Sequence, residues 1–208
     1  MEELKFKIVF VGDSTVGKTS IIRKFLKLEM DTTSTLGATS SKVETVIEGK
    51  KIVMNVWDTA GQDTFRNLVP IYAKNSNAAV IVFDQTNVTT WENVSKWYDY
   101  LLNTVGEIST ILVANKSDME CKIDLNTVYL WASEHNIDII RTSAKEGTNI
   151  DTLFDNISQL LYKQHLESLE KDSSKPEEKQ QEQAEPAPQP VQITEEPEKK
   201  QQKKSCCN

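Results

Sequence analysis

One glycine-containing stretch of this sequence has the spacing needed to hold a phosphate group. It reads GDSTVGKT and matches the pattern G-x-x-x-x-G-K-[ST]. Gly12 and Gly17 let the backbone curl, so that successive N–H groups point inward at a helix N-terminus and stabilise an anion. In this pattern the Lys18 amine reaches the β- and γ-phosphates of a nucleotide, and the Thr19 hydroxyl takes a position on Mg²⁺. The residues that we predict to contact the nucleotide here are Asp13, Ser14, Thr15, Val16, Gly17, Lys18, Thr19 and Ser20.

A second stretch, WDTAGQ, supplies groups suited to metal binding and hydrolysis. Asp58 ends an expected strand opposite the phosphate loop, where its carboxylate can hold Mg²⁺ through water. Gly61 leaves a bare N–H for a γ-phosphate oxygen. The Gln62 amide offers both a donor and an acceptor and can orient an attacking water. We therefore predict Mg²⁺ as the cofactor, and Gln62, Lys18 and Gly61 as the catalytic residues.

Two short motifs near the middle and end of the chain favour guanine as the base. In NKSD, which follows the apolar run ILVA, the Asp118 carboxylate can accept hydrogen bonds from N1–H and the 2-amino group of guanine. Adenine has no N1 donor and would leave this carboxylate unpaired, which discriminates strongly. In TSAKEG the Ala144 N–H can serve guanine O6. The predicted base-site residues are Asn115, which braces the loops, Lys116, whose stem lies over the base, Asp118, Ser143, Ala144 and Lys145.

These motifs need a scaffold that brings strand ends together, and the chain alternates strand and helix signals. Strands are expected at 5–11, on both sides of Glu48-Gly49, at 78–83, at 110–114 and at 137–141. Helices are expected at 18–26, 91–104, 125–135 and 150–166. The pattern predicts an α/β phosphate-loop fold: a mostly parallel six-stranded sheet with one antiparallel edge strand and helices on both faces. Ligands bind such sheets beyond the carboxyl ends of the strands, where the motifs fall.

Composition limits the other possibilities. The 208 residues include 38% hydrophobic residues and carry a formal charge of −7, which argues against a nucleic-acid partner. The beginning of the chain lacks a secretory signal pattern, and three cysteines favour a reducing compartment. From Leu166 onward the sequence is rich in Glu, Gln and Pro without aromatic residues or glycine. We therefore predict a domain at 1–165 and a disordered tail at 166–208.

The four motifs in this order resemble those of the Ras-like small GTPases over about residues 5–165, and NVWDTAGQDTF resembles the Rab branch. KFKIVFVG, LVPIYAKNS and VIVFDQTN look most similar to the Golgi-associated Rabs of retrograde traffic. The resemblance implies a monomeric switch that binds and hydrolyses GTP to GDP and regulates vesicle traffic. It implies that Thr35 contacts Mg²⁺ and senses the γ-phosphate. It also implies an exchange factor, a GTPase-activating protein, a GDP-dissociation inhibitor, an escort protein with a prenyltransferase, and trafficking effectors.

The chain ends in SCCN, and the resemblance implies a lipid (geranylgeranyl) group on each of Cys206 and Cys207. Two such groups give stable membrane anchoring where one is marginal. The expected location is the cytoplasmic face of Golgi or endosomal membranes, with cycling through the cytosol. A free thiol pair is the alternative for these cysteines.

The segment after Thr35 departs from the family pattern. Rabs usually continue with Ile-Gly-x-Asp-Phe, but here residues 36–40 read LGATS, so Ser40 stands where the phenylalanine is expected. This departure leaves effector choice open and motivates an alternative, a guanine-nucleotide-binding interaction module with impaired switching. A phosphate-loop ATPase or kinase is a third possibility, against which NKSD and TSAK argue.

Overall fold

The computed structural model describes residues 2–29, 35, 37–62 and 68–173, which belong to one compact unit, Met1–Ser174. A second unit, Lys175–Asn208, lies outside the described residues, so the predicted lipidation sites Cys206 and Cys207 do too. Leu36 of the altered segment is also outside them.

Six strands form one sheet in the order β2-β3-β1-β4-β5-β6. The strands are β1 (Glu3–Val11), β2 (Ala38–Ile47), β3 (Lys50–Thr59), β4 (Ala78–Asp84), β5 (Ser109–Asn115) and β6 (Asp138–Arg141). Only the β2–β3 pair is antiparallel among these strands, and its hairpin turns at Glu48-Gly49, where both residues have positive φ. The predicted fold class is therefore confirmed.

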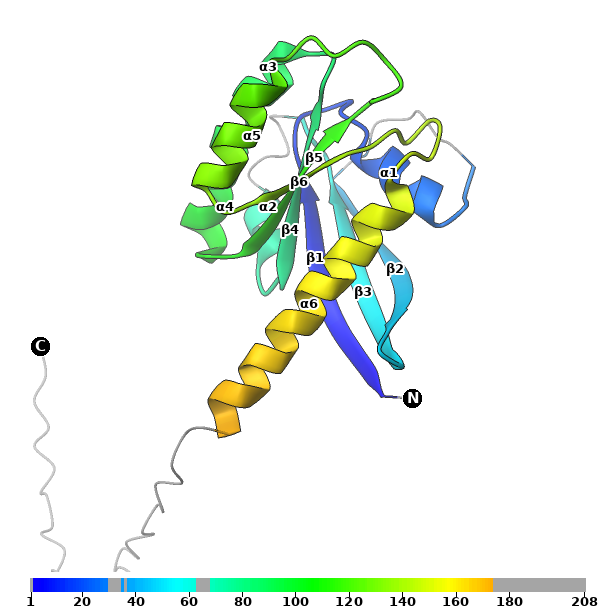
Figure 1. Cartoon of the computed structure of the whole chain (residues 1–208), viewed down its shortest axis with the longest axis vertical. Coiled ribbons are helices and arrows are strands. Elements are labelled where there is room, and N and C mark those ends of the chain that lie inside the picture. Colours follow the sequence, from blue (N-terminus) through cyan, green and yellow to red (C-terminus); the bar gives the residue numbers. More distant parts are fainter. Residues whose placement is uncertain (1, 30–34, 36, 63–67, 174–208) are drawn as a thin grey trace, which may run out of the picture. The chain divides into compact units, whose positions relative to one another are not determined.

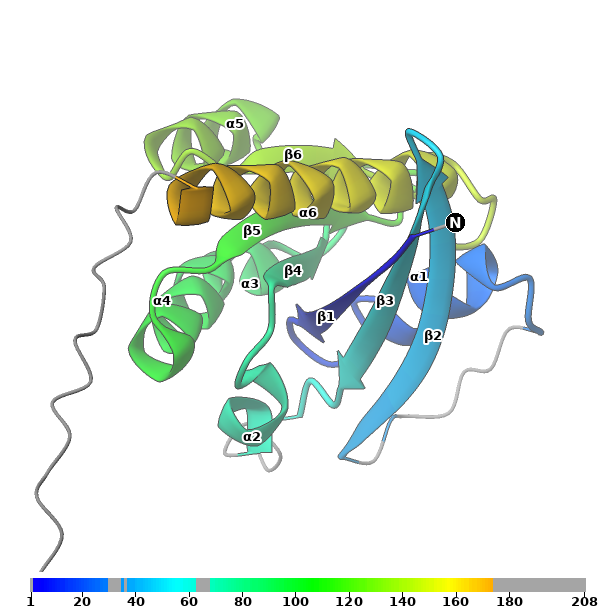
Figure 2. The ribbon, with the colours of Figure 1, turned by 90° about the horizontal axis from the view of Figure 1, so that it is seen from below.

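Helices cover both faces of the sheet (Figure 1; Figure 2). On one face α1 (Lys18–Phe25) and α6 (Ile150–Ser173) share a hydrophobic cluster with β1, β3 and β4. On the other face lie α2 (Val69–Ala73), α3 (Val88–Glu92), α4 (Val94–Val105) and α5 (Leu125–Glu134). Among the described residues no helix combines the length and apolar character needed to cross a bilayer.

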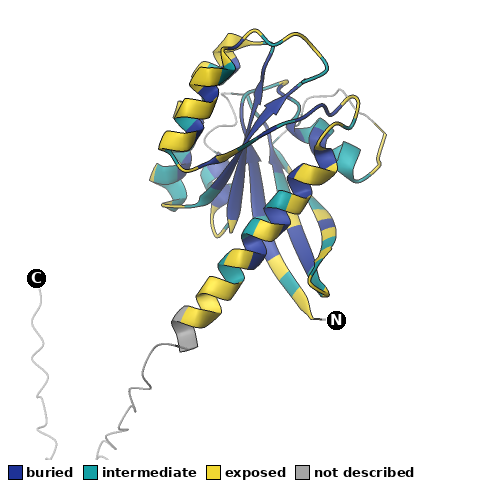
Figure 3. Ribbon diagram, viewed as in Figure 1, coloured by how far each residue is buried: buried dark blue, intermediate teal, exposed yellow. Residues whose placement is uncertain are grey.

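The central strands are the most deeply buried part of the molecule, as Figure 3 shows. Every residue of β4 is buried, which explains why its sequence is an uninterrupted apolar run up to the final aspartate. On the α1–α6 face the rings of Phe25 and Phe154 stack with centroids 4.0 Å apart. Such a pair adds about 0.5–1.5 kcal/mol beyond its area burial. The stack connects α1, and with it the preceding phosphate loop, to the N-terminal part of α6.

Three elements differ from the sequence prediction. The helix expected at 91–104 is divided into α3 and α4 at Asn93, and α2 was not predicted. The last helix runs through Ser173, so residues 166–173 of the predicted disordered tail are helical here. The boundary at 165/166 was set by composition, but Leu, Glu and Lys in this stretch are good helix formers and no proline occurs before Pro176.

Candidate functional site

The phosphate loop lies between the end of β1 and the start of α1. The Lys18 amine turns back into this loop and donates hydrogen bonds to the carbonyl oxygens of Gly12, at 2.7 Å, and Asp13, at 2.9 Å. Burial lowers the pKa of Lys18 to about 8, and the Asp58 and Asp13 carboxylates oppose this effect without cancelling it, so further negative charges would stabilise the ammonium group. A bound polyphosphate would supply those charges. Helix α1 begins after Gly17 without a side-chain cap, which leaves its N-terminal end suited to an anion.

The Asp13 side chain points to the opposite helical layer. Asn93 Nδ2 and Trp97 Nε1 each donate to one of its carboxylate oxygens, both at 2.8 Å. Asp13 can therefore offer a ligand its backbone N–H, while its carboxylate fixes the loop to α4. Asn93 and Trp97 were not predicted as site residues. The only sequence signal was a polar residue within the run WENVSKW, and the run itself resembles an ordinary amphipathic helix.

Three oxygen-bearing side chains from separate elements converge beside the phosphate loop. Thr19 Oγ1 lies 2.5 Å from Asp58 Oδ2 and 2.8 Å from Thr35 Oγ1, and Thr35 Oγ1 is 3.3 Å from the same carboxylate oxygen. Asp58 is 4% exposed, and its other oxygen, Oδ1, is buried without a hydrogen-bond partner. Burial raises the pKa of Asp58, against the opposing effect of the Thr19 hydrogen bond and Lys18. A hard cation such as Mg²⁺ prefers these oxygen donors and would satisfy the buried carboxylate.

Substituting Asp58 is expected to separate its structural cost from its role in metal binding. Without nucleotide and Mg²⁺, Asp58→Asn should raise the melting temperature at pH 7, since a neutral amide costs less to bury than a carboxylate. The expected rise is about 2–4 °C for each kcal/mol that the substitution adds to the free energy of unfolding. A carboxyl group whose pKa is raised in the folded state lowers the free energy of unfolding once the pH exceeds its pKa in the unfolded state. This loss reaches its full size above the pKa of the folded state. The difference in melting temperature should therefore shrink as the pH falls through the folded pKa.

Thermal melts of Asp58→Asn and of the exposed control Asp138→Asn at several pH values measure this effect. The Asp58 variant should also retain GTP no better with Mg²⁺ than without it. The assignment of Asp58 to metal binding would be contradicted if Asp58→Asn melted at the same temperature as the unchanged chain at pH 7 and still retained GTP better with Mg²⁺ than without it.

Gly61 approaches the phosphate loop so closely that no side chain fits there. A Cβ atom at this position would lie 2.3 Å from both the carbonyl carbon and the oxygen of Asp13. The neighbouring Ala60 N–H donates to the Gly37 carbonyl at 2.8 Å, which joins the end of β3 to the start of β2. Gln62 follows, half-buried, at the same end of the sheet. The segment that carries the predicted catalytic glycine therefore lies directly against the phosphate loop.

Gln62→Leu is expected to slow the conversion of bound GTP to GDP about tenfold or more, because leucine cannot orient water. The intrinsic rate of the unchanged chain should be on the order of 10⁻⁴ to 10⁻³ per second. Single-turnover hydrolysis without an activating protein is the required assay, since an activator can bring its own glutamine. The exposed α6 variant Gln159→Leu is the matched control. Unchanged hydrolysis by Gln62→Leu would assign the water to another group.

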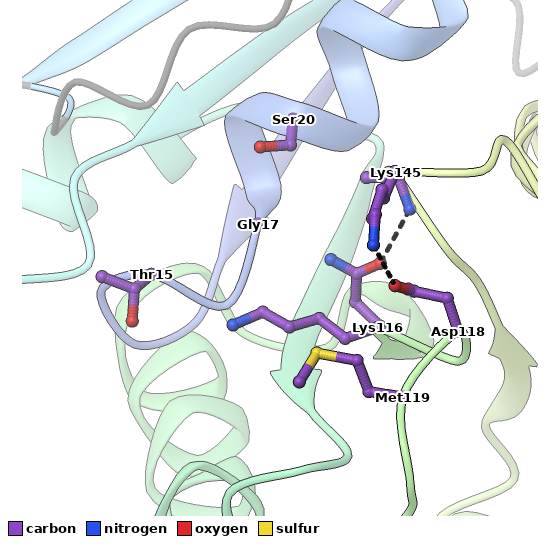
Figure 4. A pocket seen from close by; sticks show the side chains of 9 residues that line it. Thr15, Gly17, Ser20, Lys116, Asp118, Met119 and Lys145 are labelled. Atoms are coloured by element: carbon purple, nitrogen blue, oxygen red, sulfur yellow. Dashed lines mark hydrogen bonds and ion pairs between the residues drawn. The ribbon is translucent and has the colours of Figure 1, made fainter.

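A pocket at the other end of the loop brings together residues from three segments distant in sequence. Its lining is drawn in Figure 4 and consists of Thr15, Gly17, Ser20, Asn115, Lys116, Asp118, Met119, Ala144 and Lys145. The Lys116 side chain extends along the pocket with Met119 beside it. Its amine makes an ion pair of 2.6 Å with Asp84 Oδ2, so the stem of Lys116 is held in place. This is the arrangement expected of a side chain that lies over a base.

Asp118 is held in an ionised state suited to accept hydrogen bonds. Ser143 Oγ donates to Asp118 Oδ1 at 2.7 Å, and Lys145 Nζ lies 3.8 Å from Oδ2. The Ser143 hydrogen bond is the largest of the effects that lower the pKa of Asp118. The carboxylate still has lone pairs for two donors on one edge of a base.

Asn115 joins the pocket's loops from beneath and is 2% exposed. Its Nδ2 donates to the Val16 carbonyl at 2.8 Å, and its Oδ1 accepts from Thr142 Oγ1 at 3.1 Å. The Ala144 N–H also donates to this oxygen over 3.3 Å, so the predicted bond to guanine O6 competes with Asn115. A side chain at Gly17 would collide with Asn115, because its Cβ would lie 2.3 Å from Nδ2.

The structure thus gathers the predicted phosphate, metal and base residues at one end of the sheet. The roles of these residues stay predictions. A comparison with protein families supports the same kind of site: the family model described as "Ras family" matches residues 7–163. The match runs from β1 into α6 and includes the phosphate, metal and base motifs described above, but not the closing SCCN.

Proposed function

This chain belongs to the Ras family of small GTPases, and from that premise we propose that it is a Rab-type switch that regulates membrane traffic. Membership in the family implies guanine-nucleotide binding, GTP hydrolysis and the usual regulators, and members of this family generally use Mg²⁺. The assignments to the Rab branch, to traffic and to a membrane are the proposal.

The observation that carries the switch is the position of Thr35. Its hydroxyl belongs to the segment between α1 and β2, yet it lies 2.8 Å from Thr19 Oγ1 and 3.3 Å from Asp58 Oδ2. In the GTP-bound state, Mg²⁺ and the γ-phosphate beside these groups would hold Thr35 in place. Hydrolysis would remove the γ-phosphate and with it this contact to Thr35. The state of the nucleotide would thereby control the segment that leads into β2.

The surface beside this segment supports a partner that reads the nucleotide state. Trp57 and Tyr72 are half-buried and stacked with ring centroids 5.4 Å apart, and the neighbouring Ile71 is 65% exposed. On β2 the exposed Ser40 is paired in register with Trp57. We propose that effectors bind here and that Ser40, in place of the usual phenylalanine, selects partners with a different shape. An interaction module with impaired switching would bind its partners equally with GDP and with GTP.

Membrane attachment is proposed from the sequence of the tail. Cys206 and Cys207 would each carry a lipid, and the four lysines at 199, 200, 203 and 204 would add attraction to anionic headgroups of about 1 kcal/mol each. The proposed location is the cytoplasmic face of Golgi or endosomal membranes. A GDP-dissociation inhibitor would return the GDP-bound chain to the cytosol. In this proposal a prenyltransferase attaches the lipids with the help of an escort protein.

Replacing Cys206 and Cys207 together by serine is expected to move the protein wholly into the cytosol without changing its nucleotide affinity. A single replacement should leave partial membrane binding, because one lipid chain anchors only marginally. Membrane fractionation with mass spectrometry of the peptide that carries both cysteines measures this, and Cys121→Ser is the matched control. An unmodified peptide from membrane-bound protein would refute the anchor and leave the GTPase assignment intact.

A further inference from the structure

Gln85 is a fully buried polar residue that neither the phosphate loop nor the base motifs include. It directly follows β4 and is 0% exposed. A buried amide costs free energy unless its hydrogen bonds are satisfied, so its partners indicate what the residue does. Both ends of this amide have partners: one end contacts the loop that carries Asp118, and the other contacts the strand that leads to the loop with Ser143.

The nitrogen end of the amide holds the loop that carries Asp118. Gln85 Nε2 donates to the Lys116 carbonyl at 3.2 Å and to the Met119 carbonyl at 3.1 Å. These two carbonyls stand on either side of Asp118 in the sequence. The backbone of Gln85 adds two more bonds, from its N–H to the Asn115 carbonyl at 3.1 Å and from the Lys122 N–H to its own carbonyl at 2.9 Å.

The oxygen end of the amide holds the strand that leads to the second loop. Arg141 donates to Gln85 Oε1 from Nε at 3.1 Å and from Nη2 at 3.0 Å. Arg141 ends β6, and the loop with Ser143 and Ala144 follows it. The orientation of the amide is set by its partners, since carbonyls require a donor and a guanidinium requires an acceptor. Neither a carboxylate nor an aliphatic side chain could serve both ends.

We propose that Gln85 is a positioning residue that fixes both base-contacting loops and thereby sets guanine discrimination and nucleotide residence time. The inference rests on the guanine-nucleotide binding of this family. Gln85 acts through Lys116, Met119 and Arg141 and does not touch the base. With the amide in place, Asp118 and Ser143 are held at the separation that lets the carboxylate meet its two donors. Without it, the Asp118 loop keeps its backbone bonds but loses two of the side-chain bonds that restrain it.

The test compares GDP with inosine diphosphate (IDP), which lacks the 2-amino group that Asp118 is expected to bind. Gln85→Leu should speed GDP dissociation about tenfold and reduce the GDP-to-IDP affinity ratio about threefold or more, because a loosely held carboxylate gains less from the second donor. Gln85→Glu should act in the same direction, since it keeps an acceptor for Arg141 but places negative charge against two carbonyl oxygens. The rate of single-turnover hydrolysis of bound GTP should stay within about twofold of the rate of the unchanged chain, because the residues around the phosphates are not altered.

The control for a general loss of stability is Ser158→Ala. Ser158 Oγ donates to the Phe154 carbonyl at 2.7 Å and lies 2.8 Å from Thr45 Oγ1, so this change also removes buried hydrogen bonds. Because Ser158 lies on α6 away from the pocket, the variant should leave the GDP-to-IDP ratio unchanged even if its melting temperature falls. Arg141→Leu should lower the ratio less than Gln85→Leu does, because it frees only the second loop.

Two results would overturn the inference and leave the proposed function intact. If both Gln85 variants dissociate GDP and discriminate IDP as the unchanged chain does, the two loops do not depend on this amide. If the Gln85 variants and Ser158→Ala lower the ratio equally, the effect is one of general stability. An unchanged chain that binds no guanine nucleotide would instead refute the proposed function itself, and the inference with it.

Discussion

Lys18→Ala is expected to lower the affinity for GTP about a thousandfold, since a charge-assisted hydrogen bond contributes about 1.5–3 kcal/mol and Lys18 would serve two phosphates. The Lys18 amine is already fixed by the Gly12 and Asp13 carbonyl oxygens, at 2.7 and 2.9 Å. It is also 5% exposed, so little water competes with the phosphates for it. Alanine removes the positive charge and leaves the polyphosphate facing the two carbonyl oxygens alone.

Equilibrium titration with a fluorescent GTP analogue in the presence of Mg²⁺ measures this loss. Lys163→Ala, at an exposed position of α6, is the control for removing a lysine. A thermal melt of the nucleotide-free variant shows whether the fold is retained. Thr19→Asn tests the predicted Mg²⁺ position beside the phosphate loop, because it removes the hydroxyl that lies 2.5 Å from Asp58 Oδ2. Tight Mg²⁺-dependent GTP binding by both variants would disprove the phosphate site.

Asp118→Asn is expected to weaken guanine nucleotides about 10⁴-fold, which is the size of effect seen when a site built for a hydrogen bond loses its partner. Guanine presents two donors to this carboxylate, and an amide can accept from one of them while its own NH₂ group opposes the other. Xanthine carries an oxygen in place of the 2-amino group. The same variant should therefore bind xanthosine diphosphate better than GDP, which reverses the preference of the unchanged chain.

Competition between GDP and xanthosine diphosphate for each variant gives both affinities in one assay. Asp99→Asn makes the same chemical change at an exposed position of α4 and should have no effect. Ser143→Ala should give a smaller loss in the same direction, because it removes the 2.7 Å hydrogen bond that orients Asp118. If Asp118→Asn retained GDP and rejected xanthosine diphosphate, base recognition would have to reside elsewhere.

Two features of the site were predictable from neighbouring residues in the sequence. The phosphate loop required only that glycines, a lysine and a threonine follow an apolar strand, and the spacing GDSTVGKT contains all of them. The placement of Asp58, Asn115 and Thr142 at strand ends followed from the apolar runs before them. Parallel strands present their carboxyl ends at one edge, so locating the strands was enough to locate the site.

The end of the last helix illustrates a limit of composition. The tail from Leu166 is polar as a whole, yet its first eight residues continue the helix to Ser173. Helix propagation depends on each residue and its neighbours three and four positions away, and Lys163 and Glu167 form such a pair at 4.0 Å. An average over the whole tail includes its prolines and glutamines, and it hides this local preference.

The sequence by itself determined the fold class, the order of the motifs and the chemical groups available for a nucleotide, because these depend on local periodicity and on residue type. Only the tertiary structure decided which groups meet: Asp13 with Asn93 and Trp97, and Gln85 with Arg141. It also decided that Asp58 has a buried oxygen without a partner. The first two contacts join residues more than fifty positions apart in the sequence. The burial of the Asp58 oxygen depends on how tightly separate segments pack around it. No local pattern records such distances, because they are set by how the helices pack on the sheet.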